Sequence, residues 1–172
     1  NGLSQFLLTP VRYVNTLSTC AVVNPKSGWA PLANNWSRDV NYAALLDKEF
    51  GIYSERASKP PRLSIEYRIK EAGRYILYGL FYFHPAGGDI HIKVDGVGKF
   101  VAATRDSSMS YRYIPIGHAD LEERLYKIDI IGESDAENVI LAIAIIPDYI
   151  LSSTNAELSE IINDYRYKLV LR

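Results

Sequence analysis

The middle of the chain, residues 62–147, is a succession of short apolar runs separated by turn residues. In the first run, Leu63, Ile65 and Tyr67 alternate with polar side chains. Alternation with a period of two, β-branched and aromatic residues, and Gly, Pro or Asp between the runs are typical of β-strands. Amphipathic helices need a period near 3.6, which is absent here. The sequence therefore predicts an all-β domain, an antiparallel β-sandwich.

The run from Tyr75 to Phe83 differs from the first because it is apolar or aromatic on both of its faces. A strand of this kind is typical of the centre of a sheet, where both faces are covered. Asp95-Gly96 predicts a tight hairpin turn between two of the later strands. The strands predicted after Phe83 are 90–94, 100–103, 109–116, 125–131 and 139–146.

The segments on either side of this region are less regular. Pro10 interrupts an extended run over residues 6–14 and favours an edge strand, and residues 20–38 have the composition of a loop. Thr154 and Glu157 have the spacing of a capping box, which predicts a helix over residues 155–166. We also predict a short helix at 40–50, ended by Gly51, and a last strand at 167–171.

The length and charge of the chain exclude several classes. Its 172 residues are enough for one domain with its own core, so we predict a single domain over 1–172. A net charge of -1 argues against nucleic acid as a partner. The longest apolar run, Val139 to Ile146, is far shorter than the roughly 20 residues of a membrane helix. With only one Cys, one Met and one Gln, the composition favours a thermophile.

The order of the runs resembles the middle of galactose-binding-like jelly rolls, as in carbohydrate-binding modules of families six and thirty-five. The matching features are Glu71-Ala72-Gly73-Arg74-Tyr75-Ile76-Leu77-Tyr78, the hairpin Val94-Asp95-Gly96, and the last two strands at Leu125–Ile131 and Val139–Pro147. The resemblance covers about half of the chain. It implies a jelly-roll topology and binding of a glycan.

Three features depart from these families. They commonly begin with paired acidic residues that contribute to a structural calcium site, and residues 1–15 contain no Asp or Glu. Their last strand usually carries an Asp, where this chain has Ala142 and Ala144. The predicted C-terminal helix is additional. We therefore expect no cofactor, and a structural calcium ion has no support in the sequence.

Aromatic side chains in loops are the candidates for a glycan site, because flat rings stack on the C–H faces of sugars. Trp29 and Trp36 lie in the irregular segment before the sheet. The ligand-binding set predicted on this basis is Trp29, Trp36, Arg38, Tyr53, Tyr111 and Tyr113. The alternative is that both tryptophans cover an open end of the core, as large aromatic residues often do.

Other motifs carry less chemistry. Asn35-Trp36-Ser37 is an acceptor triplet for N-glycosylation at Asn35. His84 and His91 could face each other across a turn, but two ligands without a third do not make a metal site. The sequence contains no nucleophile elbow, phosphate-binding loop or paired-carboxylate motif, so we do not predict an enzyme.

The sequence thus predicts a non-catalytic, carbohydrate-binding-like accessory module of a larger exported or cell-surface protein. Its expected partners are a glycan or cell-envelope polysaccharide and the neighbouring domains of the same protein. The alternative is a structural ectodomain or assembly module that contacts other protein without binding a glycan. That alternative would need a contiguous apolar patch or an open strand edge.

Overall fold

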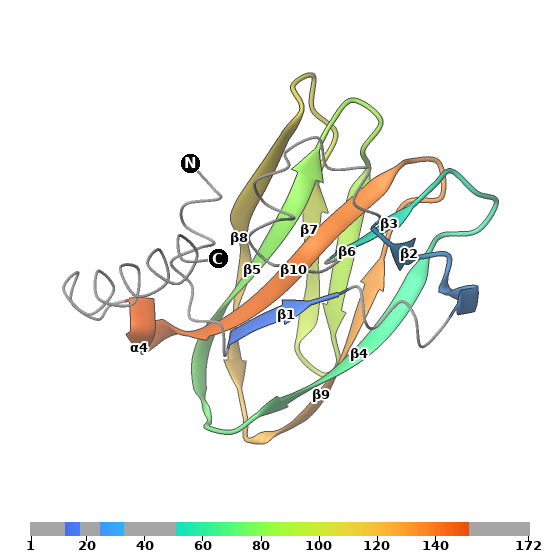
Figure 1. The fold of residues 1–172 in the computed structure, drawn as a ribbon. Coiled ribbons are helices and arrows are strands. Elements are labelled where there is room, and N and C mark those ends of the chain that lie inside the picture. Colours follow the sequence, from blue (N-terminus) through green and yellow to red (C-terminus); the bar gives the residue numbers. More distant parts are fainter. Residues whose placement is uncertain (1–12, 18–24, 33–50, 152–172) are drawn as a thin grey trace, which may run out of the picture.

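A computed structural model describes residues 13–17, 25–32 and 51–151. These residues form two antiparallel β-sheets that face each other (Figure 1). Their elements are β1 (Val14–Thr16), η2 (Pro25–Ser27), β2 (Ala30–Pro31), β3 (Ile52–Ser54), β4 (Arg62–Ile69), β5 (Gly73–Phe83), β6 (Asp89–Val94), β7 (Gly98–Ala103), β8 (Ser110–Leu121), β9 (Arg124–Ile131), β10 (Asn138–Pro147) and α4 (Asp148–Leu151).

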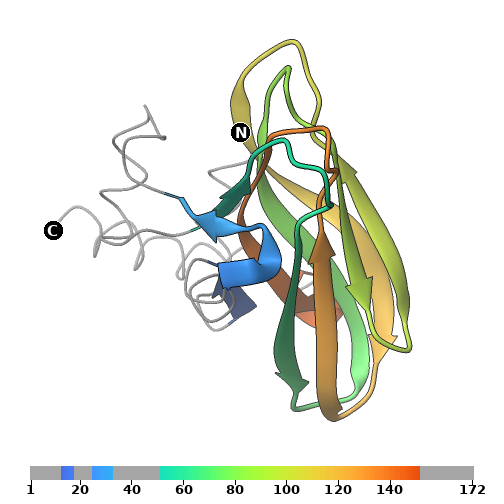
Figure 2. The same cartoon turned by 90° about the vertical axis from the view of Figure 1, so that its right-hand side faces the viewer.

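The chain passes repeatedly from one sheet to the other. The six-stranded sheet has the order β2-β3-β10-β5-β8, with β1 also paired to β10, and the four-stranded sheet has the order β4-β9-β6-β7. β4 and β5 therefore lie in opposite sheets, and β9 lies in the sheet opposite to both β8 and β10. The edge-on view in Figure 2 shows the two layers. The predicted all-β sandwich is confirmed.

Alternation along the strands builds the core between the two sheets. On β4, Leu63, Ile65 and Ile69 are buried, Tyr67 is half-buried, and the polar residues between them are exposed. The inward side chains of β9 and β6 pack against them, and almost fully covered among these are Ile128 and Ile130 on β9 and Ile90 and Ile92 on β6. This is the physical basis of a sandwich, because a period of two leaves one face of each strand for the core.

Two strands are buried on both faces. β5 lies between β10 and β8, as predicted for the run from Tyr75 to Phe83, and β10 is buried at every position. The face of β10 that points away from the core belongs to a second apolar cluster on the outer side of the six-stranded sheet. We call it the outer cluster; it consists of Leu32, Leu80, Tyr113, Val139, Leu141, Ala142, Ala144 and Ile146.

The predicted hairpin at Asp95-Gly96 is confirmed as the turn between β6 and β7. Gly96 has φ +74°, a left-handed conformation that glycine adopts without steric cost. β7 then brings Phe100 over Gly117 of β8, where a Cβ atom would lie only 2.2 Å from the ring. Gly117 therefore provides the space in which an aromatic ring closes the gap between the two sheets.

Several predicted boundaries were wrong. The strand predicted at 109–116 extends to Leu121, because it continues past an irregularity in its register opposite Leu77 and Tyr78. The loop predicted over 20–38 contains the short strand β2, which pairs with β3, and the short helix α4 follows β10 directly.

The remaining predictions on the flanking segments are only partly covered by the structure. Of the edge strand predicted at 6–14, only residues 13 and 14 are described. The predicted helices at 40–50 and 155–166 and the predicted last strand at 167–171 lie outside the described residues, as do Cys20, Asn35 and Arg38. The extent of the domain, and its place in a larger protein, stay predictions. Within the described ranges, no helix has the length and apolar character needed to cross a membrane.

Candidate functional site

An open groove of about 250 Å³ lies at the end of the sandwich where β4 ends and β5 begins. Four tyrosines form its aromatic wall, and charged side chains from the end of β4 and the following turn line its rim. We call it the tyrosine groove; its residues are Tyr13, Tyr67, Arg68, Ile69, Lys70, Glu71, Tyr75, Pro147 and Tyr149.

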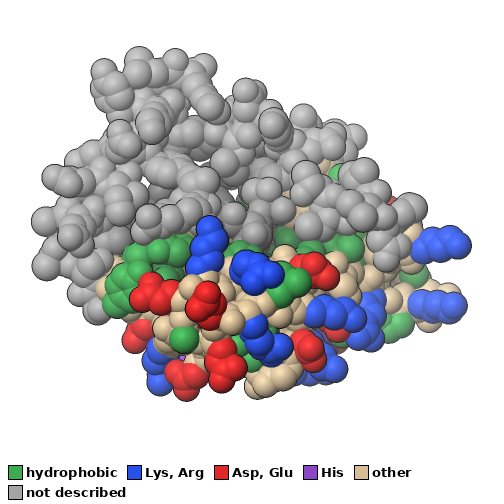
Figure 3. Space-filling model, turned by 90° about the horizontal axis from the view of Figure 1, so that it is seen from below, with side chains coloured by type: hydrophobic (Ala, Val, Ile, Leu, Met, Phe, Trp, Pro, Cys, Tyr) green, Lys and Arg blue, Asp and Glu red, His purple; other side chains and the backbone are tan. Residues whose placement is uncertain are grey.

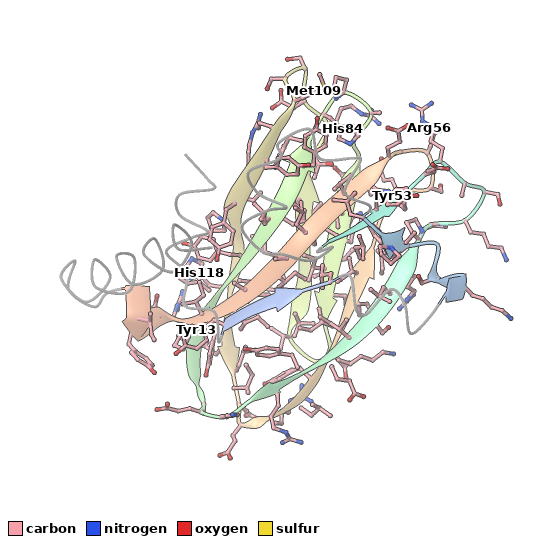
Figure 4. The ribbon with its side chains drawn as sticks, viewed as in Figure 1. Tyr13, Tyr53, Arg56, His84, Met109 and His118 are labelled. Atoms are coloured by element: carbon pink, nitrogen blue, oxygen red, sulfur yellow. The ribbon has the colours of Figure 1, made fainter. Side chains whose placement is uncertain are left out.

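Strand pairing brings these distant residues together. Tyr67 lies on β4 and Tyr75 near the start of β5, where Pro147 is its partner on β10. Tyr149 follows at once on α4, which packs against β5 and β10. Tyr13 immediately precedes β1, which is paired to the same end of β10 (Figure 4).

The four rings differ in exposure. Tyr75 is buried, Tyr13 and Tyr67 are half-buried, and Tyr149 has 61% of its surface exposed. Most of the aromatic wall therefore belongs to the packed domain, and the ring of Tyr149 lies exposed at the entrance of the groove. An exposed ring of this kind can stack on a ligand while the buried rings hold the shape of the site.

Tyr75 also fixes the rim. Its hydroxyl donates a hydrogen bond to the backbone carbonyl of Glu71, four residues earlier. Burial, and then the charge of the nearby Glu71 carboxylate, raise the pKa of the Tyr75 hydroxyl, which keeps the donor protonated. This bond ties the turn between β4 and β5 to the start of β5. Lys70 and Glu71 are thereby held beside the aromatic wall.

The composition of the groove suits a sugar. Aromatic rings supply faces for the apolar C–H surface of a pyranose, and Arg68, Lys70 and Glu71 supply donors and acceptors for its hydroxyl groups. Glycosidic hydrolysis requires two carboxyl groups on either side of the scissile bond. Of the described residues that line this groove, Glu71 alone carries a carboxylate.

Trp29, by contrast, is part of the core. Only 2% of its surface is exposed, and its indole nitrogen donates a hydrogen bond of 3.2 Å to the carbonyl of Ile130 on β9. Ser27 accepts a hydrogen bond from the Trp29 backbone and holds the loop in place. The ring has no exposed face on which a sugar could stack, so its assignment as a ligand contact is corrected. The alternative prediction, a tryptophan that covers the core, describes its position.

The other predicted tyrosines lie together on the outer side of the six-stranded sheet. Tyr113 is buried in the outer cluster and stacks on Tyr78 with ring centroids 4.8 Å apart. Tyr111 packs against Tyr82 with its ring tilted by 45° and the centroids 4.7 Å apart, and Tyr53 on β3 adjoins the same cluster. The structure therefore brings Tyr53, Tyr111 and Tyr113 to one face but separates them from Trp29. Their role in ligand binding stays a prediction, as does that of Trp36 and Arg38, which lie outside the described residues.

Sequence reasoning missed Tyr67 and Tyr149 as site residues. Tyr67 occupies a core-facing position in the alternation of β4, so the pattern indicates a buried side chain. Tyr149 lies two residues after Pro147, at the point where strand character ends. The only signal in the sequence was the high number of tyrosines, 13 in the chain.

The histidines do not form a metal site in the described part of the chain. His84 is buried and its Nε2 atom lies 2.8 Å from the carbonyl oxygen of Glu137. Within residues 13–17, 25–32 and 51–151, no three His, Cys, Asp or Glu side chains come together as a metal site would need. The expectation that the chain uses no cofactor stays a prediction.

Comparison with solved structures identifies the class of fold. A GH26-CBM35 β-(1,4)-mannanase from Podospora anserina matches with a TM-score of 0.55 at 10% identity, over 78% of this chain and 27% of the mannanase chain. A cycloisomaltooligosaccharide glucanotransferase from Paenibacillus sp. matches with a TM-score of 0.52 at 11% identity, over 76% of this chain and 18% of that chain. A structure named TmCBM61, in complex with β-1,4-galactotriose, has a TM-score of 0.49 at 16% identity, over 78% of this chain and 87% of that module.

The match to the mannanase, whose name includes CBM35, confirms at the level of the fold the predicted resemblance to the jelly rolls of carbohydrate-binding modules. The chain spans about a quarter or less of the two enzymes that it matches. No family model matches the sequence, and no curated protein matches it. The fold is therefore established by structure alone, and the function has to be argued from the site.

Proposed function

We propose that this chain is a non-catalytic glycan-binding module of an exported or cell-surface protein, with the tyrosine groove as its contact with the sugar. The observation that carries the proposal is the exposed ring of Tyr149 beside Tyr67 and Tyr13, with Arg68 and Glu71 on the rim. The fold supports it, because a chain that contains a carbohydrate-binding module shares this sandwich.

The place of the domain in a larger protein is part of the same proposal. Each enzyme that shares the fold is several times longer than the region matched here. An accessory module works by holding a polysaccharide near a partner domain, and it needs affinity rather than chemistry. A groove with an aromatic wall and a single described carboxylate provides that affinity without the acid and base of a glycosidase.

The alternative, a structural ectodomain, rests on a different feature. β7 is the last strand in the order of the four-stranded sheet, and it exposes Val101. An open edge of this kind can pair with a strand from another chain, but Lys99 on the same strand is a charge of the type that opposes such pairing. Glycan binding therefore remains the first proposal.

A glycan array on the whole chain, followed by calorimetry with the best neutral oligosaccharide, tests the proposal. Tyr149→Ala should weaken binding at least about ten-fold, the loss expected when a central aromatic contact is removed. Its exposure means that the domain should remain folded. Met109→Ala is the matched control, because Met109 is also exposed but lies far from the groove. It precedes the first residue of β8, whereas the last residue of β8 pairs with the start of β5 beside the groove (Figure 4).

Three outcomes would be informative. No binding by the wild type would favour the structural ectodomain. Binding that Tyr149→Ala leaves unchanged would exclude the tyrosine groove as the site. Binding that Trp36→Ala abolishes instead would return the site to the segment predicted from the sequence.

A further inference from the structure

A second depression of about 430 Å³ lies on another part of the surface, between η2 and the connection from β3 to β4. In Figure 1, η2 lies beside this connection at the right of the molecule. We call it the basic groove. Its polar and charged lining residues are Lys26, Ser58, Lys59, Arg62 and Ser64.

Backbone packing brings the two walls of this groove together. Gly28, next to η2, has φ +86°, and a Cβ atom there would lie 3.0 Å from the Cα atom of Pro61. Glycine thus permits both the turn and the close approach of the two segments. As a result, Lys26 on one wall faces the segment that carries Lys59 on the other.

The charge of the basic groove is one-sided. Three cationic side chains line it, and none of its described lining residues is acidic, although the chain as a whole has a net charge of -1. Seen from below in Figure 3, acidic and basic side chains are mixed over most of the described surface, whereas basic side chains project at the right-hand end, on the side of η2. Positive charge is therefore concentrated around this groove.

Asp129 on β9 offsets part of the positive charge of the groove and orients one of its cations. Its carboxylate accepts hydrogen bonds from Ser64 and from Nη2 of Arg62, at 2.9 Å in the second case. Asp129 is buried, while the Arg62 side chain is 58% exposed. A guanidinium has five N–H donors, so an arginine that is anchored through one nitrogen can still present donors to an anion.

We propose that the basic groove binds an acidic glycan, a saccharide that carries carboxylate or sulfate groups. Arg62 and the two lysines match such groups in charge, and Ser58 offers a hydroxyl to the sugar. The Ser64 hydroxyl donates to Asp129 and is left as an acceptor for a sugar hydroxyl. Its volume is in the range of about 300–1,000 Å³ that is usual for ligand pockets. No aromatic ring lines its described walls, so recognition there depends on charge and not on stacking.

This site is independent of the tyrosine groove and extends the proposed function from neutral to acidic saccharides. Nucleic acid would also respond to positive charge. A small groove with three cations on a chain of negative net charge favours a short acidic saccharide over a long phosphate backbone, which usually meets a broad basic face.

The test compares ligands that differ only in charge. Oligogalacturonate and its methyl ester form one pair, and sulfated and unsulfated dextran oligosaccharides form the other. In titrations of the whole chain, at least one pair should show binding of its charged member and no binding of its uncharged member. The affinity should fall steeply between about 0.01 M and about 1 M salt, where the Debye length shrinks from about 30 Å to about 3 Å.

Lys26→Ala and Lys59→Ala should each weaken this binding up to about five-fold, as expected for an exposed charge pair, and the double variant should weaken it further. Lys99→Ala removes another exposed charge, from β7 at the opposite edge of the four-stranded sheet from β4, and should have no effect. Neutral-glycan binding, measured in parallel, should not change in the lysine variants.

The proposal would be overturned if the methyl ester and the unsulfated dextran bound as well as their charged counterparts. Equal losses in Lys99→Ala and Lys59→Ala would show a general charge effect with no site. Equally tight binding of a single-stranded oligonucleotide of the same charge would also overturn it. Because the tyrosine groove is probed with neutral sugars, failure at either site can be distinguished from failure at the other.

Discussion

Replacement of Trp29 by alanine should destabilise the domain without removing any side chain that lines the tyrosine groove. The indole is buried in the core beneath η2 and bonded to the carbonyl of Ile130. A Trp29→Ala variant would lose both the packing of the ring and this hydrogen bond. It therefore separates the two roles that a tryptophan in this segment could have, core residue or sugar platform.

The size of the effect follows from the burial. A fully buried Trp replaced by Ala typically costs about 3–5 kcal/mol, as the sum of lost transfer energy and a residual cavity. The hydrogen bond accounts for about 1 kcal/mol of this, and Trp29→Phe should lose that amount together with a smaller packing term for the part of the indole that phenylalanine lacks. In a domain of this length each kcal/mol lowers the Tm by about 2–4 °C, so Trp29→Ala should unfold about 6–20 °C below the wild type.

Thermal unfolding followed by far-UV circular dichroism measures these shifts. A fluorescence experiment supports it: in a Trp36→Phe background Trp29 is the only tryptophan, and its emission should resist quenching by iodide. Below its own Tm, Trp29→Ala should still bind a neutral glycan with wild-type affinity. A Tm within about 2 °C of the wild type, less than the effect of 1 kcal/mol, would refute the buried position. Free access of iodide to the ring would do the same.

Two further predictions concern stability. Gly117→Ala should lower the free energy of unfolding, measured with urea, by about 1–3 kcal/mol through overpacking against the Phe100 ring. Phe100→Leu in the same chain should recover part of this loss. Gly98→Ala is the control, since a Cβ atom there meets nothing within 4 Å. Burial alone would raise the pKa of Asp129, but hydrogen bonds from Ser64 and Arg62 and the neighbouring positive charges lower it overall, so its contribution to stability is present at neutral pH and is lost as the pH falls below about 4. Asp129→Asn should lower the urea midpoint at pH 7, and the difference in midpoint between the wild type and this variant should become smaller in acid. A difference that stays constant down to the lowest pH at which both proteins fold would contradict the ion pair.

The sandwich could be predicted from the sequence because strand alternation is a local property that extends over many residues. In β4, each core residue is two positions from the next, and β5 is apolar on both faces, so the pattern gave both the strands and their depth in the fold. β2 and β3, with two and three residues, are too short to show any period. Their existence depends on pairing with each other and with β10, which no local pattern records.

The candidate site could not be predicted in the same way, because exposure at a sandwich end depends on where the strands of both sheets stop. Tyr67 and Ile65 occupy equivalent positions in the alternation of β4, yet Ile65 is buried between the sheets and Tyr67 lies at the groove. Trp29 shows the converse, since Gly28 and Ser27 turn a loop residue into the core. The loop tryptophan is thus enclosed in the core, whereas the strand tyrosine lies at a groove on the surface. Whether an aromatic residue of this domain reaches the surface thus depends on where the strands of both sheets end, which the regularity of the surrounding sequence does not show.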